Sequence, residues 1–111
     1  MPPRADQLPR SAYLVLLALA DRPRHGLAII DRVEDATHGR MKLGPGTLYG
    51  TLQKLEASGF IRETTDAPDP EDDDTRRRYY RITPRGERAL AEETASLRVL
   101  VDAAVTKASG R

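Results

Sequence analysis

The chain has 111 residues with a formal net charge of +1, and 39% of them are hydrophobic and 32% charged, which favours one domain with a small core and a highly charged surface. The absence of cysteine excludes disulfides, thiolate zinc sites and cysteine nucleophiles. No apolar run approaches the roughly 20 residues that span a bilayer, and the start MPPRADQLPR lacks the apolar stretch of a signal peptide, so we expect a cytoplasmic protein.

Two helices are predicted after a flexible leader over residues 1–10. The first begins with Ser11 as its cap and runs through AYLVLLALA, which is apolar nearly all round and therefore needs burial on more than one side. The second is expected over residues 24–37 and ends at Gly39, because its apolar residues recur with the period of a helix. Its broad apolar face comprises Leu27, Ile29, Ile30, Val33 and Ala36.

A third helix, a hairpin and a fourth helix follow. The third helix is expected over residues 45–58 and is closed by Gly59. The runs FIRETT and RRRYYRIT are typical of strands, and an acidic loop over residues 66–75, containing DAPDPEDDD, joins them. Thr83, a hydroxyl cap followed by proline, starts the last helix over residues 84–108. The predicted fold class is therefore mainly α with a small β part (α+β).

The third helix has one apolar face and one face of small and polar residues. Leu48, Leu52 and Leu55 share one side of a helical wheel and are expected to face the core. The other side carries Gly46, Gly50, Gln53 and Ala57, flanked by Thr47, Tyr49 and Lys54. A face with so little bulk can come close to a large, grooved partner. Pro45 costs little in the first turn, since its missing N–H would have no helical partner there.

This order of elements is typical of a winged helix-turn-helix. In that arrangement the later helix lies in the DNA major groove and reads base edges, and a hairpin forms the wing. The start of such a helix also offers unpaired N–H groups to a phosphate oxygen. Two interpretations stay open, because the same leucines and glycines would suit any three tightly packed helices. Tyr49 could support the core, contact DNA or do both.

The last helix has a series of residues at alternating spacings of four and three, the pattern of a helix-packing seam: Leu90, Thr94, Leu97, Val101, Ala104 and Ala108. The residues expected in a dimer interface are Leu90, Leu97, Leu100, Val101 and Ala104. At 1.5 Å per residue the helix is roughly 35 Å long, more than one small core needs. Dimerisation is therefore favoured over packing within one subunit, and two linked modules also multiply affinity.

Acidic and basic charge are separated around the predicted hairpin. Six acids lie between Asp66 and Asp74, and arginines follow from Arg76 onward. Arg77 and Arg78, near the tip, are the best candidates for phosphate contact, although such charges could also protect an edge strand from aggregation. The acidic loop is either a solvated, disordered segment or one that folds back on the arginines and competes with DNA. Its spacing does not match a calcium-binding EF-hand loop.

Three segments together resemble the PadR-like family of transcriptional regulators. LGPGTLYGTLQKLEASGFI is similar to the family's recognition-helix signature, and HGLAIIDRV resembles its second helix. RRRYYRITPRGERAL resembles its second wing strand running into the last helix. The three segments occur in the family's order from about residue 14 to residue 90, and the ordered set is much more specific than any one of them.

The resemblance implies a winged helix-turn-helix repressor that forms a homodimer through its last helix and binds a two-fold symmetric operator. Residues 11–83 would form the DNA-binding domain and residues 84–108 the dimerisation helix. The positions matching those near DNA are Pro45, Gly46, Thr47, Tyr49 and Lys54, with Arg77 and Arg78 in the wing, and the outward Gln53 completes the predicted set. No cofactor is implied, and a small-molecule effector at the dimer interface is a further partner that the resemblance allows.

An enzyme and a protein-binding module are the rival functions. His25 and His38 lie at predicted helix ends, where capping or surface roles explain them, and no nucleophile–base or metal-ligand spacing is visible, so neither catalysis nor a metal site is expected. A winged helix used for protein contact, or a regulator of another winged-helix family, stays open. Salt separates protein contact from DNA binding, because DNA binding weakens steeply with salt.

Overall fold

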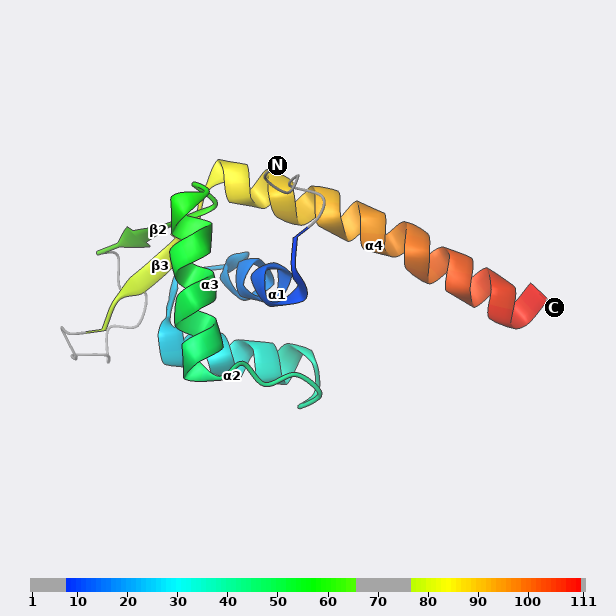
Figure 1. Ribbon diagram of the computed structural model, residues 1–111, viewed down its shortest axis with the longest axis horizontal. Coiled ribbons are helices and arrows are strands. Elements are labelled where there is room, and N and C mark those ends of the chain that lie inside the picture. The colour runs from blue at the N-terminus through cyan, green and yellow to red at the C-terminus, as the bar shows by residue number, and fades with distance from the viewer. Residues whose placement is uncertain (1–7, 66–76, 111) are drawn as a thin grey trace.

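The computed structural model describes residues 8–65 and 77–110. Its elements in chain order are α1 (Arg10–Leu19), β1 (Arg24–His25), α2 (Gly26–Ala36), α3 (Pro45–Ala57), β2 (Ile61–Thr64), β3 (Tyr79–Ile82) and α4 (Pro84–Gly110). The predicted acidic loop over residues 66–75 and most of the predicted leader lie outside the described residues. The mainly α fold with a small sheet is confirmed. Figure 1 shows α1, α2 and α3 packed together beside the sheet, while the far half of α4 projects away from them.

β3 is the central strand of a three-stranded antiparallel sheet in the order β1-β3-β2. On one side Ile61 of β2 pairs with Ile82, and on the other His25 of β1 pairs with Tyr79. The sequence pattern places residues 24 and 25 in a helix, and this prediction was wrong. β1 has only two residues, too few for a strand pattern, and His25 serves as the N-cap of α2.

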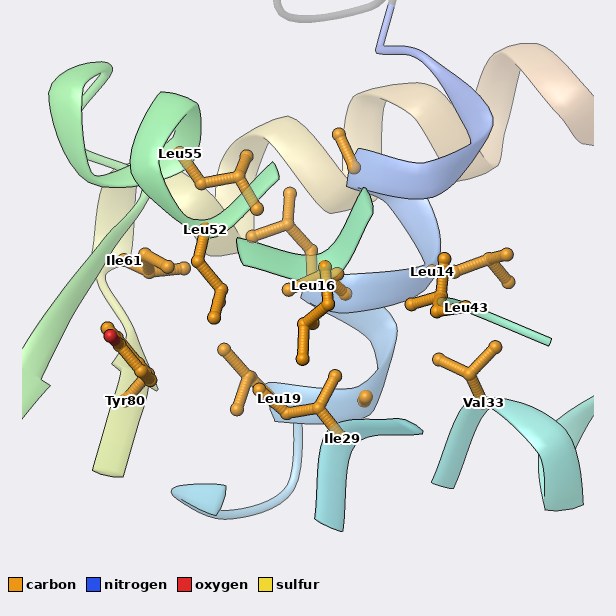
Figure 2. Packing of buried hydrophobic residues seen from close by; sticks show 14 of the residues in the cluster. Leu14, Leu16, Leu19, Ile29, Val33, Leu43, Leu52, Leu55, Ile61 and Tyr80 are labelled. Carbon is orange, nitrogen blue, oxygen red and sulfur yellow. The ribbon is translucent and has the colours of Figure 1, made fainter. Parts of the chain in front are cut away.

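The core is built around α1, whose buried residues are Ala12, Leu14, Val15, Leu16, Ala18 and Leu19. Leu48, Leu52 and Leu55 of α3 are 0%, 2% and 3% exposed, which confirms that the leucine series faces the core. Figure 2 shows Leu52 directed toward the side chains of α1, with Ile61 and Tyr80 approaching from the sheet. The polar face of α3 must therefore point outward.

Tyr79 and Tyr80 are neighbours on β3 and both are buried, although alternate residues of a strand point to opposite faces. Tyr80 belongs to the main core cluster. The Tyr79 ring meets the His25 ring edge to face, with centroids 5.3 Å apart. The middle of β3 is therefore covered on both sides, as a central strand can be.

The start of α1 differs from the sequence prediction. The helix begins at Arg10, and Pro9 rather than Ser11 occupies the N-cap position. The Ser11 hydroxyl instead accepts a hydrogen bond from Thr51 Oγ1 at 3.4 Å. Ser11 thus joins α1 to α3 rather than ending its own helix.

α2 buries a narrower face than its sequence predicts. Ile29 and Val33 are fully buried, but Leu27 is 57% exposed and Ala36 is exposed as well. The predicted face was therefore too broad, because only one stripe of this short helix meets the core. After α2, Gly39 has a φ of 78° and donates its N–H to the carbonyl of Glu34 at 2.8 Å, which confirms the predicted stop.

A single threonine joins the end of α3 to the start of α4. Thr83 Oγ1 accepts a hydrogen bond from the Gly86 N–H at 3.1 Å, which confirms the predicted cap. The same hydroxyl donates to the carbonyl of Gly59 at 2.6 Å, and the Thr83 N–H donates to the carbonyl of Phe60 at 3.0 Å. α4 then continues to Gly110, slightly beyond the predicted end.

Candidate nucleic-acid interface

The first turn of α3 is open to solvent. Gly44 is the N-cap, Pro45 follows it, and among the described residues no side chain caps the helix. The Leu48 N–H makes the first helical bond, to the Gly44 carbonyl at 2.9 Å. The amides of Gly46 and Thr47 precede that bond, so they point out of the helix start. Because the first turn carries no acidic residue, the positive end of the helix dipole is not neutralised there.

An exposed strip of polar and small residues continues along α3 from this turn. Its members are Thr47, Tyr49, Gly50, Gln53 and Lys54, all exposed. The leucines on the opposite face of α3 are buried in the core, so the strip must face the solvent. The predicted outward orientation is confirmed, and contact of this strip with DNA stays a prediction. A hydroxyl, a phenol, an amide and an ammonium give the strip donors and acceptors for base edges and phosphates.

Tyr49 bridges the strip and the start of α2. A Cβ atom added to Gly26 would lie 3.3 Å from the Tyr49 hydroxyl oxygen, and the Tyr49 side chain is still 57% exposed. The ring therefore leans across the first turn of α2. Only glycine at position 26 leaves the hydroxyl this much room.

The wing arginines and Tyr49 line one hollow of about 620 Å³. The full lining is His25, Gly26, Leu27, Tyr49, Arg77, Arg78 and Tyr80. Arg77 and Arg78 precede β3 rather than belonging to it, so the predicted second strand was too long. Arg78 Nε lies 3.6 Å from Glu63 Oε1 of β2, and Arg77 Nη1 lies 3.3 Å from His25 Nε2. The fold thus brings three predicted DNA-contact residues together around one depression.

Arg24 fixes β1 at the edge of this hollow. Its Nε donates to the carbonyl of Ala18 at 2.8 Å, and its Nη2 lies 3.2 Å from Asp21 Oδ2. Burial opposes ionisation of Asp21, but its own backbone N–H and the charge and hydrogen bond of Arg24 outweigh burial and lower the pKa of this carboxyl below 3.8. Arg24 therefore ties the end of α1 to the strand that positions His25.

The turn between α2 and α3 adds two cations that the sequence reasoning missed. Arg40 and Lys42 are exposed just before the start of α3. The Thr37 hydroxyl accepts the N–H of Met41 at 3.0 Å and so shapes the turn, while Lys42 Nζ lies 3.7 Å from Glu34 Oε1. The signal was present in the sequence, as two basic residues within the four positions that precede Gly44.

The predicted dimer residues on α4 divide into two groups. Leu90 and Leu97 are half-buried against the rest of the subunit, and Tyr13 on α1 hydrogen-bonds to Thr94 nearby at 2.8 Å. Leu100 and Val101 are 65% and 58% exposed. The exposed group also includes Ala104, and the helix exposes Val99 and Val105, which the sequence reasoning did not name. One α4 thus leaves an apolar surface on its outer half.

The described part of the chain has neither a metal-binding cluster nor a membrane-spanning helix. Over residues 8–65 and 77–110, no group of three or more histidine, aspartate and glutamate side chains is placed to hold a metal ion. Within the same two ranges, no helix combines the length and the apolar character needed to cross a membrane. The exposed face of α3 with its wing is the main candidate site.

The chain matches the Transcriptional regulator PadR-like family over residues 15–92. An uncharacterized 37.1 kDa protein in transposon TN4556 of Streptomyces fradiae is 42% identical over 84 residues. That alignment covers 76% of this chain but only 22% of the Streptomyces protein, so the chain spans about a fifth of that relative's length. The transcriptional regulator Rv3488 of Mycobacterium tuberculosis is 36% identical over 86 residues, which are 78% of this chain and 74% of that regulator.

Solved structures share the architecture. A transcriptional regulator from Clostridium thermocellum superposes with a TM-score of 0.71 at 25% identity, covering 87% of each chain. A PadR-like transcription factor from Bacteroides fragilis gives a TM-score of 0.63 at 28% identity, covering 84% of each chain. The family match spans most of the chain, and the mycobacterial relative aligns over most of both sequences. The chain therefore belongs to the PadR-like family of transcriptional regulators.

Proposed function

We propose that the protein is a transcriptional repressor that binds a two-fold symmetric DNA operator as a homodimer in the cytoplasm. The observation that carries this proposal is α3, which presents an uncapped first turn and an exposed polar strip opposite a fully buried leucine face. Such a helix can enter a major groove with its N-terminal residues against base edges. The family consists of regulators rather than enzymes, in keeping with this assignment.

Within this proposal, the residues of α3 divide by chemistry. Thr47, Tyr49 and Gln53 carry groups that can read base edges, whereas Lys54 is suited to a phosphate. The backbone at Pro45 and Gly46 lets the helix start approach the duplex closely. Arg77 and Arg78 of the wing, near the acidic stretch, would contact the adjacent backbone.

The exposed apolar surface on the outer half of α4 is the observation in favour of a homodimer. Leu100, Val101 and Ala104 lie on this exposed apolar surface, and a second copy of α4 would remove it from water. The half-buried Leu90 and Leu97 would continue the same seam toward the body of the subunit. A small-molecule effector held between the subunits would act by changing the distance between their two α3 helices.

Selection from random DNA with the purified protein tests the proposal. We expect a two-fold repeat whose half-sites are one helical turn, about 34–36 Å, or a multiple apart. Light scattering on the same preparation should give twice the mass of the chain. Recovery of an asymmetric site, or of none, would count against a homodimeric operator-binding repressor. Binding of a protein partner with little salt dependence would favour the protein-contact alternative.

A further inference from the structure

The turn between α2 and α3, residues 37–44, is held in one shape by hydrogen bonds. The Thr37 hydroxyl donates to the carbonyl of Val33 at 2.9 Å and accepts the N–H of Met41 at 3.0 Å, so it links the last turn of α2 to the chain that follows. His38 and Gly39 have positive φ angles of 53° and 78°, which turn the backbone sharply between these two contacts. The turn therefore has a defined conformation from which its side chains project.

Burial alternates along the second part of this turn. Met41 packs against the core and Leu43 is 7% exposed. Arg40 and Lys42, on either side of Met41, are exposed. Because the two apolar side chains anchor the backbone to the core, the two cationic side chains point away from it. A guanidinium and an ammonium are thus presented to solvent just before α3.

The turn lies on the opposite side of α3 from the wing. Lys42 is two residues before Gly44, the N-cap of α3, so it stands close to the first turn of that helix. Figure 1 shows β2 and β3 on one side of α3 and the turn between α2 and α3 on the other, at the end where the helix begins. Cations from two separate parts of the chain therefore flank the exposed strip of α3.

Lys42 can exchange its present partner for a phosphate. Its Nζ lies 3.7 Å from Glu34 Oε1, and the two side chains are 74% and 43% exposed. This distance exceeds the roughly 2.7–2.9 Å of a charge-assisted hydrogen bond, and exposed ion pairs are weak and screened by salt. A phosphate oxygen would therefore meet little competition from Glu34. Arg40 adds a second positive charge two residues away, on a guanidinium that can bind a phosphate through two N–H groups.

We propose that Arg40 and Lys42 form a second phosphate-binding element, which contacts the DNA backbone along the side of the major groove opposite the wing. The inference rests on the proposed function. The major groove of B-DNA is about 12 Å wide and an α-helix with its side chains about 10–12 Å, so a helix inside the groove has one DNA backbone along each side. The wing reaches one backbone and the turn between α2 and α3 reaches the other. α3 is then held in register from two sides while its own strip reads the bases.

Substitutions to glutamine remove single charges from the turn, the wing and a control position. Arg40→Gln and Lys42→Gln alter exposed side chains of the turn, so the fold should be kept, and thermal unfolding checks this. Arg77→Gln removes a charge from the wing. Arg88→Gln removes an exposed charge from α4, which begins beyond the other end of α3 in Figure 1, and serves as the matched control.

The first measurement is affinity for a random-sequence duplex and for the selected operator across a range of salt. Arg40→Gln and Lys42→Gln should each reduce the slope of log affinity against log salt by about 0.9, because one phosphate contact is lost. At about 0.1–0.15 M salt this corresponds to a loss of affinity of about fivefold to eightfold, similar on both duplexes, since phosphate contacts carry no sequence information. Arg88→Gln should change neither quantity. Unchanged slopes for both turn variants would overturn the proposal.

The second measurement locates the contacts by ethylation of single phosphates on each strand of the selected operator. In the wild type, ethylation should interfere with binding on both sides of each half-site. Arg40→Gln and Lys42→Gln should lose this interference at phosphates along one side of the groove, and Arg77→Gln along the other. Loss at the same phosphates for the turn and wing variants would overturn the assignment to opposite sides.

The inference and the proposed function fail in different ways. A protein that selects a two-fold operator, with salt slopes that Arg40→Gln and Lys42→Gln leave unchanged, refutes the phosphate contacts of the turn and leaves the proposed function standing. A protein that selects no symmetric operator, but whose binding to random-sequence DNA these variants weaken with a reduced slope, refutes the proposed function and leaves the contacts standing. A protein that binds no DNA refutes both.

Discussion

The hydroxyl oxygen of Tyr49 lies against the backbone of Gly26, where an added Cβ atom would be only 3.3 Å away. The same tyrosine is 57% exposed. Its ring therefore supports the contact between α3 and α2 and still faces outward beside the strip of α3. The structure places the tyrosine against α2 and outside the main core cluster, and its contact with DNA is the part that needs a test.

Two substitutions separate these roles of Tyr49. Tyr49→Phe keeps the ring against α2 and should change the free energy of unfolding by no more than about 0.5 kcal/mol. Tyr49→Ala should lower it by about 1 kcal/mol, because only part of the ring is buried. We expect Tyr49→Phe to weaken operator binding about threefold to tenfold through loss of the hydroxyl. Urea unfolding and fluorescence anisotropy measure the two effects, and equal DNA affinity of wild type and Tyr49→Phe would limit the tyrosine to support.

Lys54 and Gln53 are neighbours on the exposed strip but are expected to behave differently. Lys54→Ala should weaken binding by a similar factor on all duplexes and reduce the salt slope by about 0.9, as loss of one phosphate contact does. Gln53→Ala should instead change the preferred base at one position, by about 1–3 kcal/mol of discrimination. Repeating the random-DNA selection with each variant measures this. A changed consensus for Lys54→Ala would contradict the division.

Gly86 is expected to be one of the least replaceable residues of the fold. A Cβ atom there would overlap the carbonyl oxygen of Phe60 and lie 2.9 Å from Ile82 Cγ1, so α4 would have to move away from the sheet. We expect Gly86→Ala to lower the free energy of unfolding by about 3 kcal/mol. Gly50→Ala is the matched control, because nothing lies within 4 Å of its added Cβ. That control should be stabilised by about 0.5–1 kcal/mol through helix propensity, as urea unfolding can show.

The exposed end of α4 gives a prediction about assembly. Leu100→Glu keeps a good helix former at a position that is 65% exposed, so the subunit should fold normally. In the proposed dimer it places a charge in the apolar seam, and light scattering should report the mass of a single chain. Operator affinity should then fall about 100-fold, since two half-sites are no longer bound together. Arg88→Glu, which places a glutamate near the start of α4 and also removes a positive charge there, should leave the dimer intact.

Tyr80 makes the folded state sensitive to alkali. Burial raises the pKa of its phenol above 10.0, and the negative charges of Glu56 and Glu63 raise it further. Because the folded state favours the neutral phenol, this contribution to stability is complete below pH 10 and is lost as the pH rises from 10 through the folded-state pKa. Tyr80→Phe cannot ionise, so its urea midpoint should fall less steeply than that of wild type between pH 9 and pH 11. Parallel curves would contradict the assignment to Tyr80.

The parts of the fold that follow a period could be predicted, and the parts that depend on single contacts could not. Leu48, Leu52 and Leu55 repeat at helical spacing, so their burial could be predicted from the sequence. A strand of two residues has no period, and β1 exists because His25 pairs with Tyr79 across the sheet.

The same distinction holds at the candidate site. Exposure of the α3 strip follows from burial of the opposite face, and the sequence pattern of the helix indicates both faces. The contact between His25 and Arg77 joins residues 52 positions apart, and it forms because β3 pairs with β1. Ser11 shows the opposite error, since a residue suited to a cap lies inside the helix and links it to α3 because α1 begins two residues earlier than expected.

The hydrogen bonds of Thr83 leave no flexible linker between the part of the protein that would read DNA and the part that would pair subunits. Its hydroxyl bonds to the carbonyl of Gly59 after α3 and to the N–H of Gly86 in the first turn of α4, so one side chain joins the two helices directly. In a dimer built on α4, any change in the angle between the paired helices would then move both α3 helices by a fixed amount. The spacing between operator half-sites that the dimer prefers would therefore report the angle at which the two α4 helices pair.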